Sequence, residues 1–589
     1  MAYVQQMYPW AFPGCTYTLT YYPNASYAAS QVYGGTCSGY NGFVATAYLY
    51  VPDKNTGKPC DCAGDPINLG TGNEYRDDED AALDGLSFHR YYNSHAAVAS
   101  SHIGAHWRHS FDRRLEYLSG GGTTVIATVF RPDGLQVAFT LSNGQWTTDP
   151  DVADRLTTQT DSNGVITGWS YFDASTRYQE AYDANGYLLS ITDTRGEVTA
   201  LAYSTASTPT SVAPSAGLLL TVTDPHGRSL SFTYNTQGNI ATVTQPDGGM
   251  LSYSYDATTG NLLTVTYPDT KTRQYVYNES ALTGGANLPN ALTGDIDETG
   301  SRLTSIGYNG QGQATMSMLP GNVDLTQVSY NTDGTTSVTY PTGTQTTLGF
   351  TVPNGSMHTN TVSAPCGPSC GQPNKAATFD SNGYPASTTD FNNNVTQTTY
   401  NAYGLLHIEV DGSGTPDQRT TTTTWNGASR LPLTRQVQDA QGHVITQSAW
   451  VYNVLNEVHV RCDMDLAIPA AASYVCSDTG TPPAGVRRWI YHYCGAVDTT
   501  QCPIIGLPLT VDGPRTDVSD ITTYTYYMLD GVNHHHGDLK SITDPLGHVT
   551  TYVTYDGAGR VTAMQDANGV YTDMTYSPRG WLTSRTRFG

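Results

Sequence analysis

Hydrophobic and polar residues alternate over short runs along most of the chain. Two examples are residues 261–267, Asn-Leu-Leu-Thr-Val-Thr-Tyr, and residues 273–277, Arg-Gln-Tyr-Val-Tyr. A period of two places one kind of residue on each face of a β-strand. Runs at helical spacing that are rich in Leu or Ala are few. The pattern therefore predicts an all-β protein built from short strands.

A turn motif separates these runs: an aromatic residue, then Asp or Asn, then Gly three positions after the Asp or Asn. Asp and Asn start turns by bonding their own backbone, and Gly adopts the positive φ that closes them. We expect hairpin turns at Tyr182, Asp183 and Gly186; Tyr234, Asn235 and Gly238; Tyr308, Asn309 and Gly312; Tyr330, Asn331 and Gly334; Phe379, Asp380 and Gly383; Tyr400, Asn401 and Gly404; and Tyr555, Asp556 and Gly559. Two variants also belong to this set: Tyr255 and Asp256 reach Gly260 after one extra residue, and Tyr576 keeps Gly580 but has Ser577.

The motif recurs every 21 or 22 residues, as between Tyr234, Tyr255 and Tyr277. A second turn lies inside the unit, for example at residues 224–227, 246–249 and 544–547. Each unit is therefore predicted to form two short strands and two turns. Successive units are expected to join into one long antiparallel sheet. Many units are needed, because a lone hairpin is marginal in water whereas stacked units bury one face and pair their edges.

Two units, residues 182–193 and 555–562, resemble the YD repeat of RHS proteins and teneurins. Residues 64–74, 86–92, 107–111 and 130–134 are similar to the stretch that opens the repeat region in this family, so the resemblance covers roughly residues 64–589. It implies a long spiralling antiparallel sheet of YD-repeat hairpins that forms a hollow shell or part of one. In RHS toxins such a shell encloses a C-terminal toxic domain, and in teneurins it is an extracellular scaffold.

Repeat and resemblance together divide the chain into five parts. We expect a cysteine-containing β cap at 1–63, an RHS-type opening region at 64–150, YD repeats at 151–404, divergent or decorated repeats with disulfides at 405–535, and YD repeats at 536–589. The family's C-terminal core motif, an Asp-Pro-x-Gly-Leu signature with autoproteolytic aspartates, is missing, since residues 544–547 are followed by His548. The chain is therefore interpreted as ending inside the array, as a fragment or as one part of a split shell.

The amino-acid composition favours β-sheet and disfavours some classes of binding partner. Charged residues make up only 13% of the chain, against a usual value of about 25%, while Tyr (42) and Gly (59) are abundant. The net charge of −23 disfavours nucleic acid and anionic lipid as partners. No apolar run reaches the roughly 18 residues that span a bilayer, and residues 1–13 show no signal-peptide pattern.

Ten cysteines occur, mostly in close pairs, which favours short-loop disulfides and an oxidising compartment over zinc. The candidate disulfide residues are Cys15 and Cys37, Cys366 and Cys370, Cys462 and Cys476, and Cys494 and Cys502. Cys60 and Cys62 are too close for an unstrained bridge and are expected to pair elsewhere, if at all.

No residue qualifies as a catalytic, cofactor-binding or metal-binding candidate on sequence grounds, and no cofactor is expected. The histidines at 534–536 are interpreted as a solvated loop, and the five between His89 and His109 as packing residues. The acidic run at 77–80 is interpreted as an exposed loop rather than a calcium site. The repeat Asp and Asn residues are expected to form turns rather than act as acids or bases.

Three functions remain as hypotheses. The first is a non-catalytic shell or scaffold segment of a secreted RHS-type polymorphic-toxin protein, which encloses or presents a C-terminal toxin or cargo domain. The second is a cell-surface adhesin or fibre that binds a receptor or glycan and self-associates. The third is an enzyme hidden in residues 405–535. The first two place the protein outside the cell, secreted or at the cell surface.

Overall fold

The computed structural model describes residues 54–58, 62–96, 102–120, 123–365 and 374–588, together with the backbone of strands β1 (Leu19–Tyr22), β2 (Val32–Thr36) and β3 (Thr46–Tyr50). Cys15, Cys37, Cys60, Cys366 and Cys370 lie outside the described residues.

Four small antiparallel sheets precede the repeats. Strands β1–β3 form one sheet, and β4 (Cys62–Ala63) pairs with β5 (Ile67–Asn68). A three-stranded sheet contains β6 (Tyr75–Ala81), β7 (Phe88–Asn93) and β8 (Trp107–His109). A four-stranded sheet contains β9 (Arg114–Gly120), β10 (Thr123–Phe130), β11 (Gln136–Ser142) and β12 (Gln145–Thr147).

The rest of the described chain forms one antiparallel sheet of 34 strands, β13 to β46, in which each strand pairs with the next strand in sequence. This confirms the predicted fold class.

The first strands of this sheet are β13 (Arg155–Thr160), β14 (Ile166–Phe172), β15 (Gln179–Asp183), β16 (Leu188–Thr192), β17 (Val198–Tyr203), β18 (Leu219–Thr223), β19 (Ser229–Tyr234), β20 (Ile240–Thr244), β21 (Met250–Tyr255), β22 (Leu262–Thr266), β23 (Thr272–Tyr277) and β24 (Leu292–Ile296). The middle strands are β25 (Arg302–Tyr308), β26 (Ala314–Leu319), β27 (Val323–Tyr330), β28 (Thr336–Thr339), β29 (Gln345–Thr351), β30 (His358–Val362), β31 (Asn374–Phe379), β32 (Pro385–Asp390), β33 (Val395–Tyr400), β34 (Leu406–Asp411) and β35 (Arg419–Asn426). The last strands are β36 (Leu431–Gln438), β37 (Val444–Tyr452), β38 (Val458–Asp465), β39 (Val486–Tyr493), β40 (Pro508–Asp512), β41 (Ile521–Tyr526), β42 (Leu539–Thr543), β43 (Val549–Tyr555), β44 (Val561–Gln565), β45 (Tyr571–Tyr576) and β46 (Leu582–Phe588). Helical segments within this part are short: η1 (Pro320–Asn322), η2 (Pro353–Gly355) and α2 (Pro469–Ala472).

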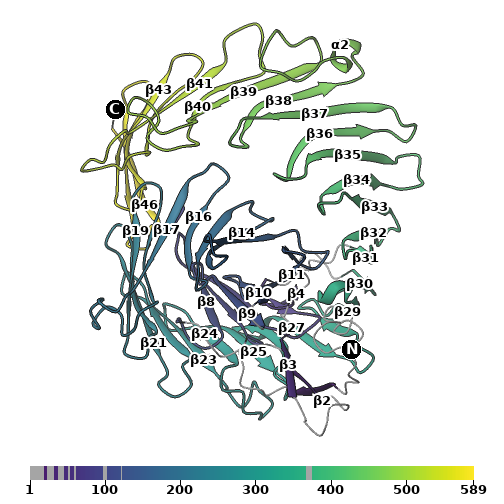
Figure 1. The fold of residues 1–589 in the computed structure, drawn as a ribbon, viewed down its shortest axis with the longest axis vertical. Coiled ribbons are helices and arrows are strands. Elements are labelled where there is room, and N and C mark those ends of the chain that lie inside the picture. The colour runs from purple at the N-terminus through teal and green to yellow at the C-terminus, as the bar shows by residue number, and fades with distance from the viewer. Residues whose placement is uncertain are drawn as a thin grey trace.

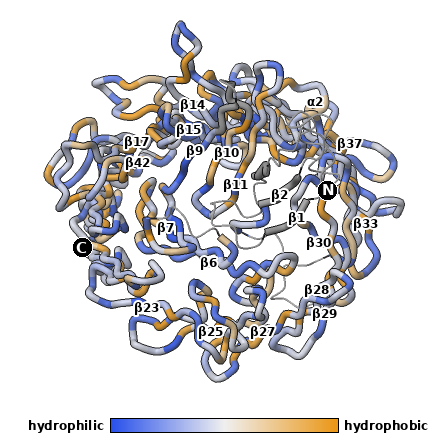
Figure 2. Tube along the Cα trace, turned by 60° about the horizontal axis from the view of Figure 1, so that its bottom comes forward, coloured by the Kyte–Doolittle hydropathy of each residue, from blue (hydrophilic) through white to orange (hydrophobic). Residues whose placement is uncertain are grey.

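The long sheet curves into an open spiral. Its strands run around a ring, and the last strands return beside the early strands β17 to β21 (Figure 1). Strands β6, β7 and β9–β11 lie inside the ring (Figure 2). The described residues between 62 and 147, which we call the inner region, therefore lie within the curve of the sheet.

The early strands bury one face against this inner region. Strands β18, β20 and β22 share the burial pattern of two buried positions three residues apart, such as Leu219 and Val222 in β18. These side chains join a core that contains Phe88, Trp107 and Val129 of the inner region. We call this the inner face of the sheet.

The strand register carries the inner face through the whole sheet, because directly paired residues point to the same side. Between β31 and β35 the sheet has no buried layer, since no residue of these strands is buried, whereas buried residues recur from β36 on. We call strands β31–β41 the wall. Hydroxyl pairs bridge neighbouring strands on the outer side, as between Thr424 and Thr434 Oγ1 at 2.6 Å and between Thr525 Oγ1 and Ser541 Oγ at 2.7 Å.

The repeat Asp and Asn residues close the turns through the backbone. Asp183 Oδ1 accepts hydrogen bonds from the backbone N–H groups of Asn185 at 2.9 Å and Tyr187 at 2.8 Å. Gly186 takes φ +83° and donates its N–H to the Asp183 carbonyl at 3.1 Å. The same double contact occurs at Asn235, Asn309, Asp380, Asn401 and Asp556.

The repeat tyrosines bridge strands where the backbone ladder ends. Strands β18 and β19 are paired only from Thr221 to Thr223, and beyond that point Tyr234 donates its hydroxyl to the Leu219 carbonyl at 2.8 Å. The same bridge joins the following tyrosines to carbonyls: Tyr255 to Ile240, Tyr308 to Leu292, Tyr330 to Ala314, Tyr452 to Pro432, Tyr526 to Pro508, Tyr555 to Leu539, and Tyr576 to Val561. Tyr182 differs, since its hydroxyl donates to the Glu180 carboxylate. The tyrosine hydroxyl thus donates a hydrogen bond to a carbonyl that lies beyond the end of the strand pairing.

We expect Tyr555→Phe to lower the free energy of unfolding by about 1 kcal/mol, because the Leu539 carbonyl loses its donor while ring packing is kept. Urea unfolding followed by tryptophan fluorescence measures the change. Tyr571→Phe is the matched control, since this ring is 44% exposed. Equal stabilities of the two variants would show that the hydroxyl bridge contributes nothing.

Candidate functional site at the wall and its seam

The returning strands contact the early strands through their turns. The loop between β39 and β40 lies on the turn between β16 and β17, where Ile505 approaches Gly196. Likewise, the turn between β43 and β44 lies on the turn between β20 and β21, and the turn between β45 and β46 on the turn between β22 and β23. Each contact joins elements 23 strands apart (39 against 16, 45 against 22), so one winding of the spiral takes 23 strands. We call this line of turn-to-turn contacts the seam.

Arginines on the YD turns hold the seam. Arg560 pairs with Asp247 at 2.6 Å, across the seam, and with Asp556 at 2.7 Å, within its own turn. Arg579 pairs with Asp269 at 2.9 Å and with Glu298 at 3.0 Å. Its guanidinium also lies 3.8 Å from the centre of the Tyr267 ring, where cation–π attraction adds to the ion pairs.

The histidine run lies at the seam, which corrects its interpretation as a solvated loop. His536 Nε2 lies 3.1 Å from the Pro225 carbonyl of the early turn, and its Nδ1 lies 2.9 Å from Asp530. His226 Nδ1 contacts the His536 carbonyl at 3.1 Å. The loop is ordered by these contacts because it fills the space between two turns, and sequence spacing alone cannot reveal that neighbour.

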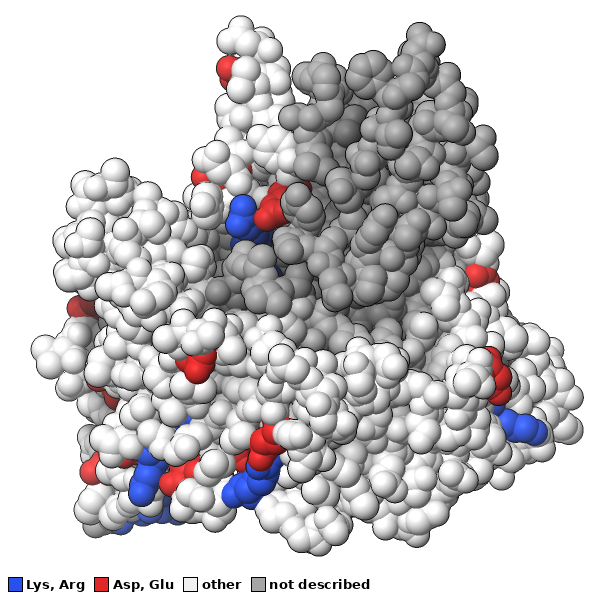
Figure 3. Space-filling model, turned by 90° about the horizontal axis from the view of Figure 1, so that it is seen from below, with Lys and Arg blue, Asp and Glu red and all other residues white. Residues whose placement is uncertain are grey.

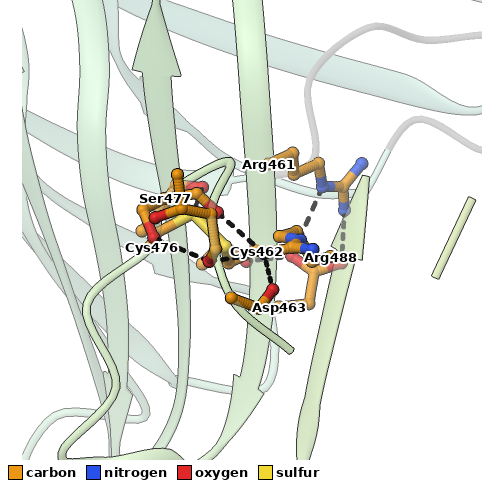
Figure 4. Close-up of a disulfide and its surroundings, with 10 residues drawn as sticks. Arg461, Cys462, Asp463, Cys476, Ser477 and Arg488 are labelled. Atoms are coloured by element: carbon orange, nitrogen blue, oxygen red, sulfur yellow. Dashed lines mark hydrogen bonds and ion pairs between the residues drawn. A yellow bond between two sulfur atoms is a disulfide. The ribbon is translucent and has the colours of Figure 1, made fainter. Parts of the chain in front are cut away.

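Two disulfides are present in the described residues, Cys462–Cys476 and Cys494–Cys502. The second closes the β39–β40 loop that carries Ile504 and Ile505 to the seam, and both of its cysteines are buried. The first ties β38 to the excursion that contains α2 (Figure 4). Each bridge fixes a long insertion against the sheet and limits the loop's conformational freedom.

A buried ionic cluster joins the inner region to the early sheet, which corrects the interpretation of residues 77–80 as an exposed loop. These residues belong to β6, and strand alternation turns Asp78 and Asp80 inward while Asp77 and Glu79 face solvent. Arg90 pairs with Asp80 at 2.5 Å and bonds the Tyr275 hydroxyl at 2.8 Å.

Arg76 extends the cluster to Asp295 of β24 at 3.2 Å. Burial by itself raises the pKa of Asp78, but Arg76 and Arg90 outweigh it and hold that pKa below its usual value. The two arginines therefore keep the buried Asp78 carboxylate charged.

The histidines of the inner region differ in their surroundings. Burial lowers the pKa of His106 and of His109 to about 4, so both stay neutral near neutral pH. His89 is less buried and pairs with Asp77 at 2.7 Å, and the hydrogen bond to Asp77 raises its pKa. Across the described residues, no group of three or more His, Cys, Asp or Glu side chains is arranged to hold a metal ion.

One cavity of about 670 Å³ lies where the inner region, the start of the long sheet and the wall meet. Three of its cations pair with acids: Lys54 with Asp149 at 2.5 Å and Asp151 at 2.7 Å, Arg131 with Asp173 at 2.7 Å, and Arg113 with Glu180. Arg430 also lines the cavity and forms no ion pair with a described acid.

The charged side chains are sparse at the surface as well. On the face in Figure 3, Lys and Arg atoms lie beside Asp and Glu atoms on a largely uncharged surface. Among the helices of the described chain, none is long and apolar enough to cross a membrane.

Comparison with known proteins identifies the class. The family model described as RHS Repeat matches residues 214–250, 234–272, 534–571 and 555–589. A second model, a domain of unknown function termed DUF6531, matches residues 64–139. The repeat matches show RHS repeats at residues 214–272 and 534–589, which confirms the predicted resemblance to the RHS/YD-repeat family.

The solved structures with detectable similarity are distant. The TcdB2-TccC3-Cdc42 crystal structure is 11% identical, with 85% of this chain and 31% of that chain covered and a TM-score of 0.39. The Photorhabdus luminescens Tc holotoxin pore with the TccC3-D651A mutation is 13% identical, with 85% and 27% covered and a TM-score of 0.37. A porin-like protein from Bacteroides uniformis is 9% identical, with 46% and 92% covered and a TM-score of 0.17. This chain spans about a third of the length of the TcdB2-TccC3 chain in the first of these. No curated protein matches.

The sequence motif located the turns but not the residues that meet across the seam. Trp425-Asn426 and Tyr452-Asn453 lack the Gly, and the left-handed position falls instead on Arg430 (φ +55°) and Asn456 (φ +64°). One signal for the seam was available in the sequence: Arg560, which follows the turn glycine Gly559. Its partner across the seam can be identified only when the number of strands in one winding is known.

We expect Arg579→Ala to loosen the seam at the last hairpin by about 1–2 kcal/mol, since it removes two partly buried ion pairs and a cation–π contact. Hydrogen exchange of residues 571–588 should then become about tenfold faster. Arg585→Ala is the control, because Arg585 is exposed on β46 and forms no ion pair with a described residue. Unchanged exchange in the Arg579 variant would mean that the seam does not depend on this side chain.

Glu197 gives the seam a pH dependence. Its Oε2 accepts from Arg195 at 2.6 Å, its Oε1 is buried without a hydrogen bond, and burial raises its pKa to about 7. Between about pH 4.5 and pH 7 the folded chain keeps a proton that the unfolded chain has lost, so this group's contribution to stability falls as pH rises through that window.

The variant Glu197→Gln stays neutral at every pH. We expect its Tm, relative to the native chain, to rise between about pH 5 and pH 7.5. Scanning calorimetry at the two pH values measures the difference, with the exposed Glu116→Gln as control. A Tm difference that stays constant with pH would contradict the raised pKa.

Proposed function

We propose that this chain is a non-catalytic segment of an RHS-type shell that is secreted or displayed at the cell surface and encloses a polypeptide cargo, such as a toxin domain. The division into cap, opening region, repeats and decorated repeats drawn above is part of this proposal.

The single observation that carries the proposal is the wall. A sheet usually packs one face against another layer, yet no residue of β31–β35 is buried on either side. Thr and Ser lie on both faces of β32, β33 and β35, so these strands form a thin, wettable partition. Such a partition separates an interior from the solvent without being a core itself.

The seam supports the same function. A spiral sheet can bound a volume only if successive windings stay in contact, and the arginine pairs at Asp247 and Asp269 hold them together. The two disulfides are consistent with an oxidising compartment, as expected of an extracellular protein.

Adjacent threonines of β35 test enclosure, because they lie on opposite faces. Thr421 pairs with Val437 on the inner face, and Thr422 pairs with Gln436 on the outer face. We expect a small maleimide to label Thr421→Cys and Thr422→Cys at similar rates. A bulky polymer-linked maleimide should label the Thr422 variant and react much more slowly with the Thr421 variant.

Peptide mapping by mass spectrometry assigns each label to its site, so the native cysteines do not interfere. Equal reaction of both variants with the bulky reagent would mean that the inner face is open to the bulk solvent, and enclosure would fail.

A further inference from the structure

Two rows of exposed or half-exposed side chains lie side by side on the inner face of β36–β39. The register places Arg435 opposite Ser448, Ser448 opposite Asp463, and Asp463 opposite Arg487. It also places Trp450 opposite Arg461, and Arg461 opposite Trp489, in the adjacent row. We call these two rows the Trp450–Trp489 patch.

The patch lies on the inner face by direct pairing. Thr423 of β35 pairs with Arg435, and the chain of pairs leads back through Thr421, Glu409 and Thr398 toward the buried residues of the early strands. The opposite face of β38 is occupied: Cys462 bonds Cys476, and the excursion with α2 covers Val460 and Met464. Figure 4 shows Arg461 and the disulfide extending from β38 in opposite directions.

Two arginines of the patch carry uncompensated charge. Arg435 and Arg487 are exposed, and neither forms an ion pair with any described acid. Arg461, by contrast, pairs with Asp463 at 2.8 Å and lies 5.3 Å from the Trp489 ring centre. Most of the other arginines of this chain, which has a net charge of −23, pair with carboxylates, as Arg560 and Arg579 do.

The composition of the patch is that of a protein-binding surface. Trp, Tyr and Arg dominate binding energy at interfaces, because they offer large rigid areas and several donors. Trp450 and Trp489 are half-buried, and Leu433 beside them is 39% exposed. Each of these side chains keeps part of its surface exposed, and Arg461 covers part of the Trp489 ring.

The spacing of the two free arginines specifies the ligand. Arg435 and Arg487 are three strands apart, which is about 14 Å at a strand spacing of about 4.8 Å. An extended peptide advances about 3.4 Å per residue, so side chains at positions i and i+4 on one face are also about 14 Å apart. Carboxylates at these positions reach both guanidinium groups. A side chain at i+2 lies over Ser448 and Asp463, next to the row that contains Trp450 and Trp489, so an apolar side chain there can contact the tryptophan rings.

We propose that the Trp450–Trp489 patch docks an extended acidic segment of the enclosed polypeptide, with carboxylates four residues apart and an apolar residue between them. The inference rests on the proposed function, since it assigns the inner face to a cargo. It goes further in naming where the cargo is held and by which chemistry.

The test uses the full chain and the fluorescein-labelled peptide Gly-Glu-Ser-Phe-Ser-Glu-Gly in fluorescence anisotropy. We expect saturable binding that weakens with salt, and a loss of about tenfold in affinity for the double variant Arg435→Ala/Arg487→Ala. The double variant Arg435→Lys/Arg487→Lys should keep part of the affinity. Lys271→Ala, which removes an exposed cation from a turn of the early strands, should bind like the native chain.

Two peptides control for sequence: one with Lys in place of both Glu residues, and one with the two Glu residues adjacent. Neither should bind as well as the probe. Equal binding of all three peptides, no binding of the probe, or full affinity in the Arg435→Ala/Arg487→Ala variant would overturn the proposal. Tighter binding of an uncharged cello-oligosaccharide, lost in Trp450→Ala/Trp489→Ala, would overturn it in favour of a glycan site.

Labelling of the β35 cysteines tests the proposed enclosure independently of the peptide-binding site. If the Thr421→Cys variant is shielded from the bulky reagent but the probe does not bind, the proposed enclosure is supported and only the proposed docking patch is contradicted. If both β35 cysteines react equally with the bulky reagent, enclosure fails whatever the peptide does.

Discussion

Lateral hydrogen bonding between consecutive strands is the interaction on which this molecule depends. In β31–β35 no second layer supplies a core, so the ladder, its hydroxyl pairs and its turns must hold the strands in place. The ladder is incomplete at the YD end of each unit, because the strands splay there. The tyrosine hydroxyls restore the missing bonds, as Tyr234 does at the Leu219 carbonyl. This arrangement explains why a protein with little charge and modest hydrophobicity is so rich in Tyr and Thr.

The curvature of the sheet brings distant turns together (Figure 1). After 23 strands the spiral returns to its own edge, where unpaired turns would otherwise face solvent. Arg560 and Arg579 neutralise acids of the early turns at that line, and the loop closed by Cys494 and Cys502 packs beside Gly196. The seam lies between turns rather than between strands, so it depends on particular side chains, whereas the ladder depends on backbone hydrogen bonds.

The inner region gives the two parts of the sheet different characters. Where it packs, hydrophobic side chains and the Arg76–Arg90 cluster create a conventional core across β18–β25. Where it does not, the same face of the sheet remains polar and carries the Trp450–Trp489 patch. The inner face thus packs against the inner region along the early strands, and along β36–β39 it keeps exposed polar and aromatic side chains.

The sequence by itself determined the local structure. Period-two alternation and the Tyr-Asp-x-x-Gly motif fix strands and turns, because both depend only on residues a few positions apart. They correctly place β22 and β23 within one residue or so of the predicted runs. They also give the sheet order, since each hairpin pairs with the next.

Only the tertiary structure decided which turns meet, which acids are buried and which face is open. The acidic run at 77–80 looked solvated because the sequence does not show that Asp80 is buried with Arg90 of the next strand, or that Asp78 meets Tyr275, which is 197 residues away. The histidines at 534–536 looked free because Pro225 lies 311 residues away from His536. These contacts follow from the accumulated curvature of many units, and a small change in twist per strand would bring different turns together. Curvature is a sum over the whole sheet, and no local pattern of residues encodes it.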